Sequence, residues 1–216
     1  MFFKSKDAKR IKHEFIKKYI QGKTLDIGYG AYPSPVAEDF YGIDIQDSET
    51  PKGYKEVKSV DLNLNPIPYD NNFFDTVIAL DVVEHLMNPL KVFLEVNRIL
   101  KKGGKFIFVV PNPHFYKEII SNIFAGYFFK SNEMPSQEAH INLPTRHTAR
   151  TMFWWSGFAL SDEIGFGFPI PKTKLVMKME KFPGLAYEVI YVAEKISDEP
   201  KFSIITKQTD GEWKMM

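Results

Sequence analysis

The sequence predicts an α/β fold built on a doubly wound, mostly parallel sheet. Apolar, β-rich runs alternate with helical patterns through the first half of the 216 residues. One of these runs, Thr76–Leu80, is apolar almost throughout, as expected for a strand that is buried on both faces. Right-handed crossovers then place helices on both faces of the sheet and ligands at the carboxyl ends of its strands.

Five strands are expected in the first half. They are Leu25–Gly28, Phe40–Ile45, part of Tyr54–Leu62, Phe73–Leu80 and Lys105–Pro111. After the fourth strand, Asn88 and Pro89 predict a helix start, because asparagine caps helices and proline suits the first position. The run Lys101–Gly104 predicts the end of that helix.

The second half has a different character. An aromatic segment contains a short amphipathic helix, and Thr145 is expected to cap a later helix that ends at Gly157. The runs Lys174–Met179 and Leu185–Lys195 flank a turn and predict an antiparallel hairpin. Residues from 197 onward are mostly polar and are expected to form a loosely held tail.

Composition narrows the functional classes. The net charge of +1 predicts no strongly acidic or basic partner, and the absence of cysteine excludes disulfides and thiolate chemistry. No apolar run approaches the ~20 residues that a membrane helix needs, and the N-terminus lacks the apolar core of a signal peptide. We therefore expect a cytoplasmic protein without stable membrane insertion.

Positive charge is concentrated near the N-terminus. Residues 1–23 carry eight basic side chains against Asp7 and Glu14. A basic helix of this kind can contact a nucleic acid or a membrane surface. Apolar side chains recur within it at helical spacing, at Ile11, Phe15, Ile16, Tyr19 and Ile20. The favoured interpretation is a helix that packs on the domain and leaves its charged face in solvent.

Glycine and polar residues follow four of the predicted strands where each ends. They are Asp26, Gly28 and Gly30, then Asp44, then Asp61 and Leu62, and finally Asp81, Glu84 and His85. The glycines let a ligand approach the backbone, and Asp44 can accept both hydroxyls of a ribose. Asp61 can accept from the amino group of an adenine, with Leu62 against its ring. Each residue alone could equally serve in an ordinary turn or helix cap. Their common position at one edge of the sheet is what indicates a binding site.

These pieces together resemble a class I S-adenosylmethionine-dependent methyltransferase of the type-11-like, small-molecule kind. The matching stretches are "LDIGYG", "YGIDI", "SVDLNLNPIPYDNNFFDTVIALDVVEHLMNPLKVFLEVNRILKKGGKFIFVVPNP" and, more loosely, "HINLPTRHTARTMFWWSGF". The resemblance covers roughly residues 20–160. It implies a Rossmann-like sheet of seven strands with an antiparallel C-terminal hairpin, a transferase activity, and S-adenosyl-L-methionine as the cofactor.

The resemblance also implies which residues bind the cofactor. Those near the methionine portion are Asp26, Gly28, Tyr29, Gly30, Leu80 and Asp81; those near the ribose and adenine are Asp44, Ile45, Asp61 and Leu62; and His85 lines the pocket. The spacing of Asp81, Glu84 and His85 resembles that of some quinone-pathway O-methyltransferases that use a divalent cation. Such residues at a helix start are more common as caps, so no metal ligand is predicted.

We expect one domain over residues 1–216. Its parts are an N-terminal helix (1–22), a cofactor-binding half (23–112), an aromatic lid and acceptor segment (113–145), a C-terminal helix with a hairpin (146–196), and a tail (197–216).

The loop after the first strand departs from the family pattern D-x-G-x-G-x-G. Tyr32 stands at the third glycine position, and Pro33 and Pro35 follow it. We therefore expect the first crossover helix to be truncated or irregular, with Tyr29 and Tyr32 left near the cofactor.

Methyl transfer to an unidentified, small-molecule acceptor is the favoured function. A hydroxyl acceptor needs a base, and His85, His114 and His140 are the candidates because imidazole titrates near neutrality. The aromatic residues within His114–Lys130 predict a lid and an acceptor that is apolar or contains a ring. A core role, a homodimer contact and a transient membrane contact are the alternatives for this segment.

Three other functions stay open. A nicotinamide oxidoreductase is disfavoured, because Pro33 stands at the last position of G-x-G-x-x-G. A catalytically lapsed binding protein is compatible with the irregular loop. Methylation of RNA or another macromolecule is supported by the basic N-terminal helix alone, and no nucleic-acid partner is expected.

Overall fold

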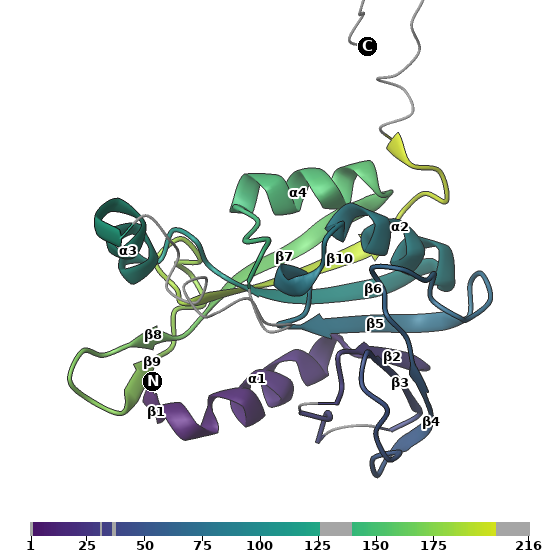
Figure 1. Ribbon diagram of the computed structural model, residues 1–216, viewed down its shortest axis with the longest axis horizontal. Helices are drawn as coiled ribbons and strands as arrows, with labels where there is room; N and C mark the ends of the chain where they lie inside the picture. Colours follow the sequence, from purple (N-terminus) through teal and green to yellow (C-terminus); the bar gives the residue numbers. More distant parts are fainter. Residues whose placement is uncertain (1, 31, 36–37, 126–139, 202–216) are drawn as a thin grey trace, which may run out of the picture.

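A central sheet of seven strands, in the order β4-β3-β2-β5-β6-β10-β7, organises the computed structural model (Figure 1). The structure describes residues 2–30, 32–35, 38–125 and 140–201. Strands β2 to β6 are parallel, and β10 runs antiparallel to both β6 and β7. The predicted doubly wound α/β fold with an antiparallel C-terminal hairpin is confirmed.

The parallel strands lie close to their predicted positions. They are β2 (Thr24–Ile27), β3 (Phe40–Asp44), β4 (Tyr54–Ser59), β5 (Phe74–Leu80) and β6 (Leu100–Pro111). The helix α2 (Pro89–Ile99) begins as predicted, since the side-chain oxygen of Asn88 accepts from the Lys91 amide at 3.1 Å. Its predicted end at Lys101–Gly104 is wrong. The helix stops at Ile99, and those residues begin β6, where Gly103 bends the strand at a φ of 77°.

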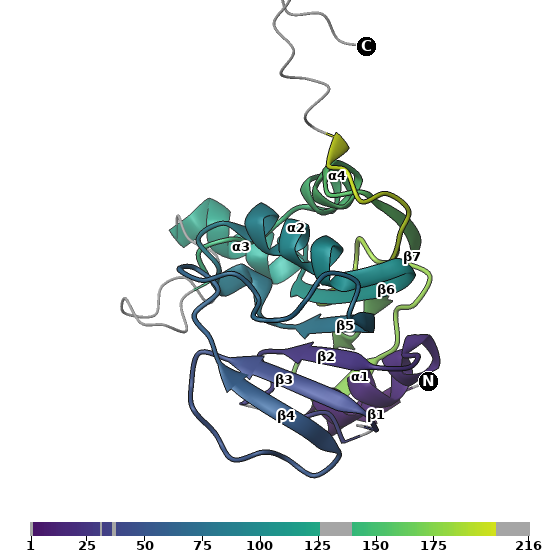
Figure 2. The same ribbon diagram turned by 90° about the vertical axis from the view of Figure 1, so that its right-hand side faces the viewer.

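Helices cover both faces of the sheet (Figures 1 and 2). One face packs against α2 and α4 (Arg146–Trp155) through a core that includes Phe93, Phe106 and Phe153. The opposite face carries α1 (Ala8–Ile16), whose Ile16 is completely buried and belongs to the same core cluster as Phe40, Ile78 and Val109 of the sheet. Between β2 and β3 the described residues form no helix, as predicted for the crossover. The N-terminal helix therefore covers this face in its place.

The C-terminal hairpin has a different first arm from the one expected. Its arms are β7 (Phe158–Phe166) and β10 (Glu188–Lys195), whereas the prediction placed the first arm at Lys174–Met179. The polar run Ser161–Glu163 hid β7, because an edge strand can leave one face exposed. Within Lys174–Met179, β9 (Leu175–Met177) pairs instead with β1 (Phe2–Lys4) and β8 (Phe168–Pro169) in a small second sheet.

Short elements complete the fold. They are the 3-10 turns η1 (Ser5–Asp7), η2 (Lys17–Tyr19) and η3 (Val83–His85), and the helix α3 (Tyr116–Ala125). Thr145 caps α4 as predicted, by accepting from the Thr148 amide at 3.1 Å. Among the described residues, no helix has the length and apolar character to cross a membrane.

The structure describes part of the aromatic segment. Phe115 is buried and packs against Phe168 and Tyr187, which favours a core role for this residue. The positions of Tyr127, Phe128 and Phe129 lie outside the described residues, as does the tail from residue 202. The predicted lid therefore stays a prediction.

Candidate functional site

The candidate site lies where the strand order reverses, beside the carboxyl ends of β2 and β5. These strands are neighbours in the sheet, but the chain leaves β2 toward β3 on one side and β5 toward β6 on the other. Crevices at such switch points are where open α/β sheets bind ligands. The predicted glycine turn, Asp44 and Asp81 all follow strands at this edge.

The glycine turn after β2 is fixed to its neighbours. Gly28 has a φ of 80°, and a Cβ atom there would lie 2.3 Å from a methyl carbon of Val82. The Gly30 amide donates to Oδ2 of Asp44 at 2.9 Å, and a Cβ at Gly30 would lie 3.0 Å from the carboxyl carbon of Asp44. The other oxygen of Asp44 accepts from the Gln46 amide at 3.0 Å. Asp44 thus holds the turn in place, and the backbone of Gly28–Gly30 forms an ordered shelf beside it.

Asp26 and Tyr54 hold the proline-containing loop. The Tyr54 hydroxyl donates to Oδ2 of Asp26 at 2.5 Å and accepts from the Ser34 amide at 2.9 Å. Both side chains are buried, and burial raises the pKa of Asp26 to about 7. The segment around Pro33 and Pro35 is therefore tied to β4. Nothing in the sequence distinguished Tyr54 from an ordinary core aromatic residue.

A small cavity of about 90 Å³ lies at this edge. Its lining combines Asp26, Gly28, Leu80 and Asp81, all predicted, with Tyr32 from the loop and Lys9, Lys12 and His13 from α1. The three α1 residues were not predicted to reach the site. Their helix looked like a basic surface helix, and only the fold shows that one side of it faces the strand ends.

Lys12 connects three elements. Its ammonium donates to Asp81 after β5 at 2.5 Å and to Glu188 at the start of β10 at 2.9 Å. Burial alone would lower the pKa of Lys12, but attraction by Glu188 and Asp81 outweighs this effect and holds that pKa above its usual range. Asp81 has a φ of 57°, an uncommon conformation for a residue other than glycine.

Two polar atoms beside Lys12 lack hydrogen-bond partners among the described residues. They are Oδ1 of Asp81 and Nδ1 of His13, both buried. Burial, with the charge of Lys12 next in importance, lowers the pKa of His13 to about 4, so this imidazole is neutral at pH 7. Unsatisfied buried polar atoms are rare in folded proteins and often mark a ligand site.

The predicted adenine contacts divide into two groups. Ile45 is 48% exposed, and Asp61 borders an open hollow of about 650 Å³ that Val60 and Pro66 also line. The side chain of Leu62 is instead buried in the protein core, as is that of Tyr29, which was predicted near the methionine portion and packs its ring against Tyr54. For Leu62 and Tyr29, this leaves the backbone as the part that can face a ligand.

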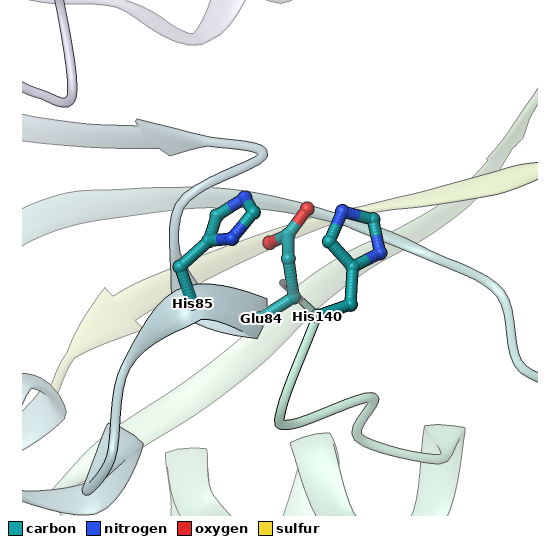
Figure 3. A group of neighbouring side chains, drawn as sticks. All are labelled: Glu84, His85 and His140. Carbon is teal, nitrogen blue, oxygen red and sulfur yellow. The ribbon is translucent and has the colours of Figure 1, made fainter. Parts of the chain in front are cut away.

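Two of the three histidine candidates lie together. The imidazoles of His85 and His140 have ring centroids 4.9 Å apart, and the carboxylate of Glu84 lies close to both of them (Figure 3). Burial, with the charge of Asp81 next, raises the pKa of Glu84 to about 8. His114 is exposed and is not part of this group. No sequence pattern indicated that His140 would lie next to Glu84.

Comparison with known proteins identifies the class. Residues 25–108 match the family model described as "Methyltransferase domain". An uncharacterized protein of Methanocaldococcus jannaschii is 32% identical over 145 residues, which are 64% of this chain and 58% of that protein. Sarcosine/dimethylglycine N-methyltransferase of Halorhodospira halochloris is 36% identical over 55 residues, 26% of this chain and 20% of that enzyme. The chain spans about half the length of the first curated relatives it matches.

Solved structures show the same fold. A SAM-dependent methyltransferase of Thermotoga maritima aligns with a TM-score of 0.63 at 16% identity, over 88% of this chain and 90% of that one. A chain from the complex between the Haloferax volcanii Trm112 methyltransferase activator and its methyltransferase aligns with a TM-score of 0.58 at 14% identity, over 89% of this chain and 93% of that one. The fold is therefore that of class I methyltransferases.

The match runs from β2 into β6, so this part of the chain is similar to a methyltransferase domain. The cofactor that such a domain implies is S-adenosyl-L-methionine.

The Lys12 contacts predict a stability effect. Lys12→Met leaves Glu188 and Asp81 without their cation, so we expect the free energy of unfolding to fall by about 3 kcal/mol in urea denaturation. Lys9→Met is the matched control, because Lys9 is exposed on the same helix, and it should change the free energy by less than about 0.5 kcal/mol. Equal effects of the two substitutions would contradict the assigned contacts.

Asp26 predicts a pH dependence of stability. Its pKa is about 7 in the folded protein, above the ordinary value of 3.8, so the folded state keeps a proton that the unfolded state releases. Stability from this group is therefore present at pH 4 and is lost as the pH rises toward 7. In Asp26→Asn, denaturation between pH 4 and 7 should show a shallower loss of stability than in wild type. Glu84 contributes equally to the pH dependence of wild type and of Asp26→Asn. Parallel pH profiles of the two would therefore refute the raised pKa of Asp26.

Proposed function

We propose that the protein is a methyltransferase that uses S-adenosyl-L-methionine to methylate a small-molecule acceptor. The observation that carries this proposal is the Gly28–Gly30 shelf locked to Asp44 at the switch point of the sheet. The turn presents backbone rather than side chains, and the carboxylate beside it has a fixed orientation. This combination suits a nucleoside with an extended, charged substituent.

The adenosine end of the cofactor would lie along the ends of β3 and β4. Asp44 would accept from the ribose hydroxyls, because two backbone amides already hold its oxygens at this place. Ile45 offers an exposed apolar side chain next to it, which suits a purine ring. Asp61, at the edge of the neighbouring hollow, would accept from the adenine amino group.

The methionine end would lie toward α1. Its carboxylate matches the positive side chains of Lys9 and Lys12, and its ammonium matches Asp81, whose Oδ1 has no partner among the described atoms. The cavity of about 90 Å³ is smaller than the ~300 Å³ of a typical small-molecule site. Binding therefore requires the side chains of α1 to rearrange, and we infer that this helix covers the methionine end.

The cofactor, when bound, supplies a methyl group that its positively charged sulfur already activates for displacement. The work left to the protein is to align the acceptor with that methyl group and to exclude water, and alignment alone can provide most of the rate. A hydroxyl acceptor must also lose a proton. His85 and His140 are the better placed candidates for this role, since they lie together and half-buried, whereas His114 is exposed.

Macromolecular methylation is the less supported alternative. The basic helix α1 was its main support, and Lys12 is now seen to be buried in an ion-paired contact. Lys9 and Lys18 lie over the rings of Tyr32 and Phe15, at 5.2 and 4.6 Å from the centroids. An apolar or ring-containing acceptor, a homodimer contact and a cytoplasmic location stay predictions.

Cofactor titration tests the proposal. Isothermal titration of the full chain with S-adenosylmethionine, S-adenosylhomocysteine and NAD should give saturable binding of the two adenosyl compounds only. Asp44→Ala should weaken that binding about tenfold or more, because it removes charged hydrogen bonds to the ribose.

The matched control is Asp162→Ala, which removes an exposed carboxylate from the edge strand β7. It should leave both affinities unchanged. Binding of NAD without either adenosyl compound would overturn the proposed function, and unchanged affinity in Asp44→Ala would overturn the ribose assignment.

A further inference from the structure

We propose that Glu84, His85 and His140 form a binding site for one divalent transition-metal ion. Each side chain offers one ligand atom, and these three atoms all lie within 4.8 Å of one another. Figure 3 shows the carboxylate of Glu84 close to both imidazoles, all three facing a common space. The site does not depend on methyl transfer, and it departs from the absence of metal ligands expected from the sequence.

The distances are close to those of a metal site. An ion bound at ~2.1 Å from nitrogen and oxygen ligands in tetrahedral geometry holds those atoms ~3.4 Å apart. The observed limit of 4.8 Å exceeds this by an amount that small side-chain rotations can remove.

Glu84 supplies an independent observation. Its side chain is completely buried, and neither carboxylate oxygen has a hydrogen-bond partner among the described residues. A buried carboxylate without a partner is costly, and buried charges are normally paired or bound to a metal. Asn97 of α2 shows how a buried polar side chain is usually satisfied, since its amide donates to the Ser197 carbonyl at 2.9 Å.

The charges around the cluster favour a cation. Asp81 and Glu188 both act electrostatically on Glu84, and Lys12 is the positive side chain that acts on it alongside them. Beside Glu84, the two carboxylates of Asp81 and Glu188 thus face one ammonium. A divalent ion at Glu84 would balance this excess of negative charge.

Backbone hydrogen bonds hold the two contributing segments together. The amides of Ile141 and Asn142 both donate to the carbonyl of Glu84, each at 2.9 Å. The side-chain amide of Asn142 also donates to the carbonyl of Leu86. His140 is therefore held next to η3 by the residues that directly follow it, although 54 positions separate it from Leu86 in the sequence. These contacts keep the two segments that carry the ligands next to each other.

The ligands indicate the class of ion. Two imidazole nitrogens and one carboxylate oxygen suit zinc, cobalt, iron or manganese better than calcium or magnesium, which prefer oxygen alone. Three protein ligands also leave a coordination position open, as in catalytic zinc sites. The half-buried histidines give the ion a path from solvent to the buried Glu84. If the ion is bound, the two histidines are its ligands and are not available as bases.

Metal titration of the untagged, chelator-treated full chain tests the proposal. We expect one Co²⁺ per chain, detected by visible absorption, and one Zn²⁺ per chain in calorimetry, with micromolar or tighter affinity. Glu84→Gln and His140→Ala should each weaken binding at least tenfold, because each removes a ligand. His147→Ala, which removes an exposed histidine on α4, is the control and should bind as wild type does.

Circular dichroism and thermal denaturation without metal show whether each variant is folded, and His140→Gln replaces His140→Ala if the latter is not. Zn²⁺ should raise the melting temperature of wild type and of His147→Ala, but not of the ligand variants. No saturable binding by wild type, or equal binding by the His140 and His147 variants, would overturn the metal site. Titration of the metal-free chain with S-adenosylhomocysteine tests the proposed function separately, so either proposal can fail without the other.

Discussion

The buried ion pairs of Lys12 are the constraint on which the arrangement of this site depends. One ammonium joins α1 to the end of β5 and to the start of β10, through contacts of 2.5 and 2.9 Å. A charge buried to this degree cannot lose its partners without a large cost, so the helix has one favourable position on the sheet. The shortened crossover after β2 makes this position necessary, because α1 covers the face on which a crossover helix would otherwise pack.

This position gives the N-terminal helix a second role. The same contacts that attach α1 bring Lys9, Lys12 and His13 to the cavity beside Gly28. The glycine shelf and Asp44 come from the part of the chain that matches the methyltransferase domain, whereas α1 precedes that part. Under the proposed function, the matched region would bind the adenosine end of the cofactor, and α1, outside that region, would close the methionine end. Asp81 connects the two parts, since it directly follows β5 and pairs with Lys12.

Local patterns in the sequence were sufficient to predict the parallel strands, the N-terminal caps of two helices and the glycine turn. Apolar strand segments alternate with segments of helical periodicity. At position 28 the backbone has a positive φ, which glycine adopts readily and few other residues do. The contacts that complete the site join residues far apart, such as Lys12 with Glu188 or His140 with Glu84. No spacing rule connects such pairs before the fold is known. The strand β7 was missed for a local reason, because its polar Ser161–Glu163 run resembles a loop.

Hydrogen–deuterium exchange with and without S-adenosylhomocysteine tests most directly whether α1 is part of the cofactor site. If Lys9 and Lys12 contact the bound methionine portion, the amides of Ala8–Ile16 should become more protected at the same ligand concentrations as those of Gly28 and Gly30. Protection of the glycine turn with unchanged or faster exchange in α1 would contradict this account, and would place the methionine portion away from the helix.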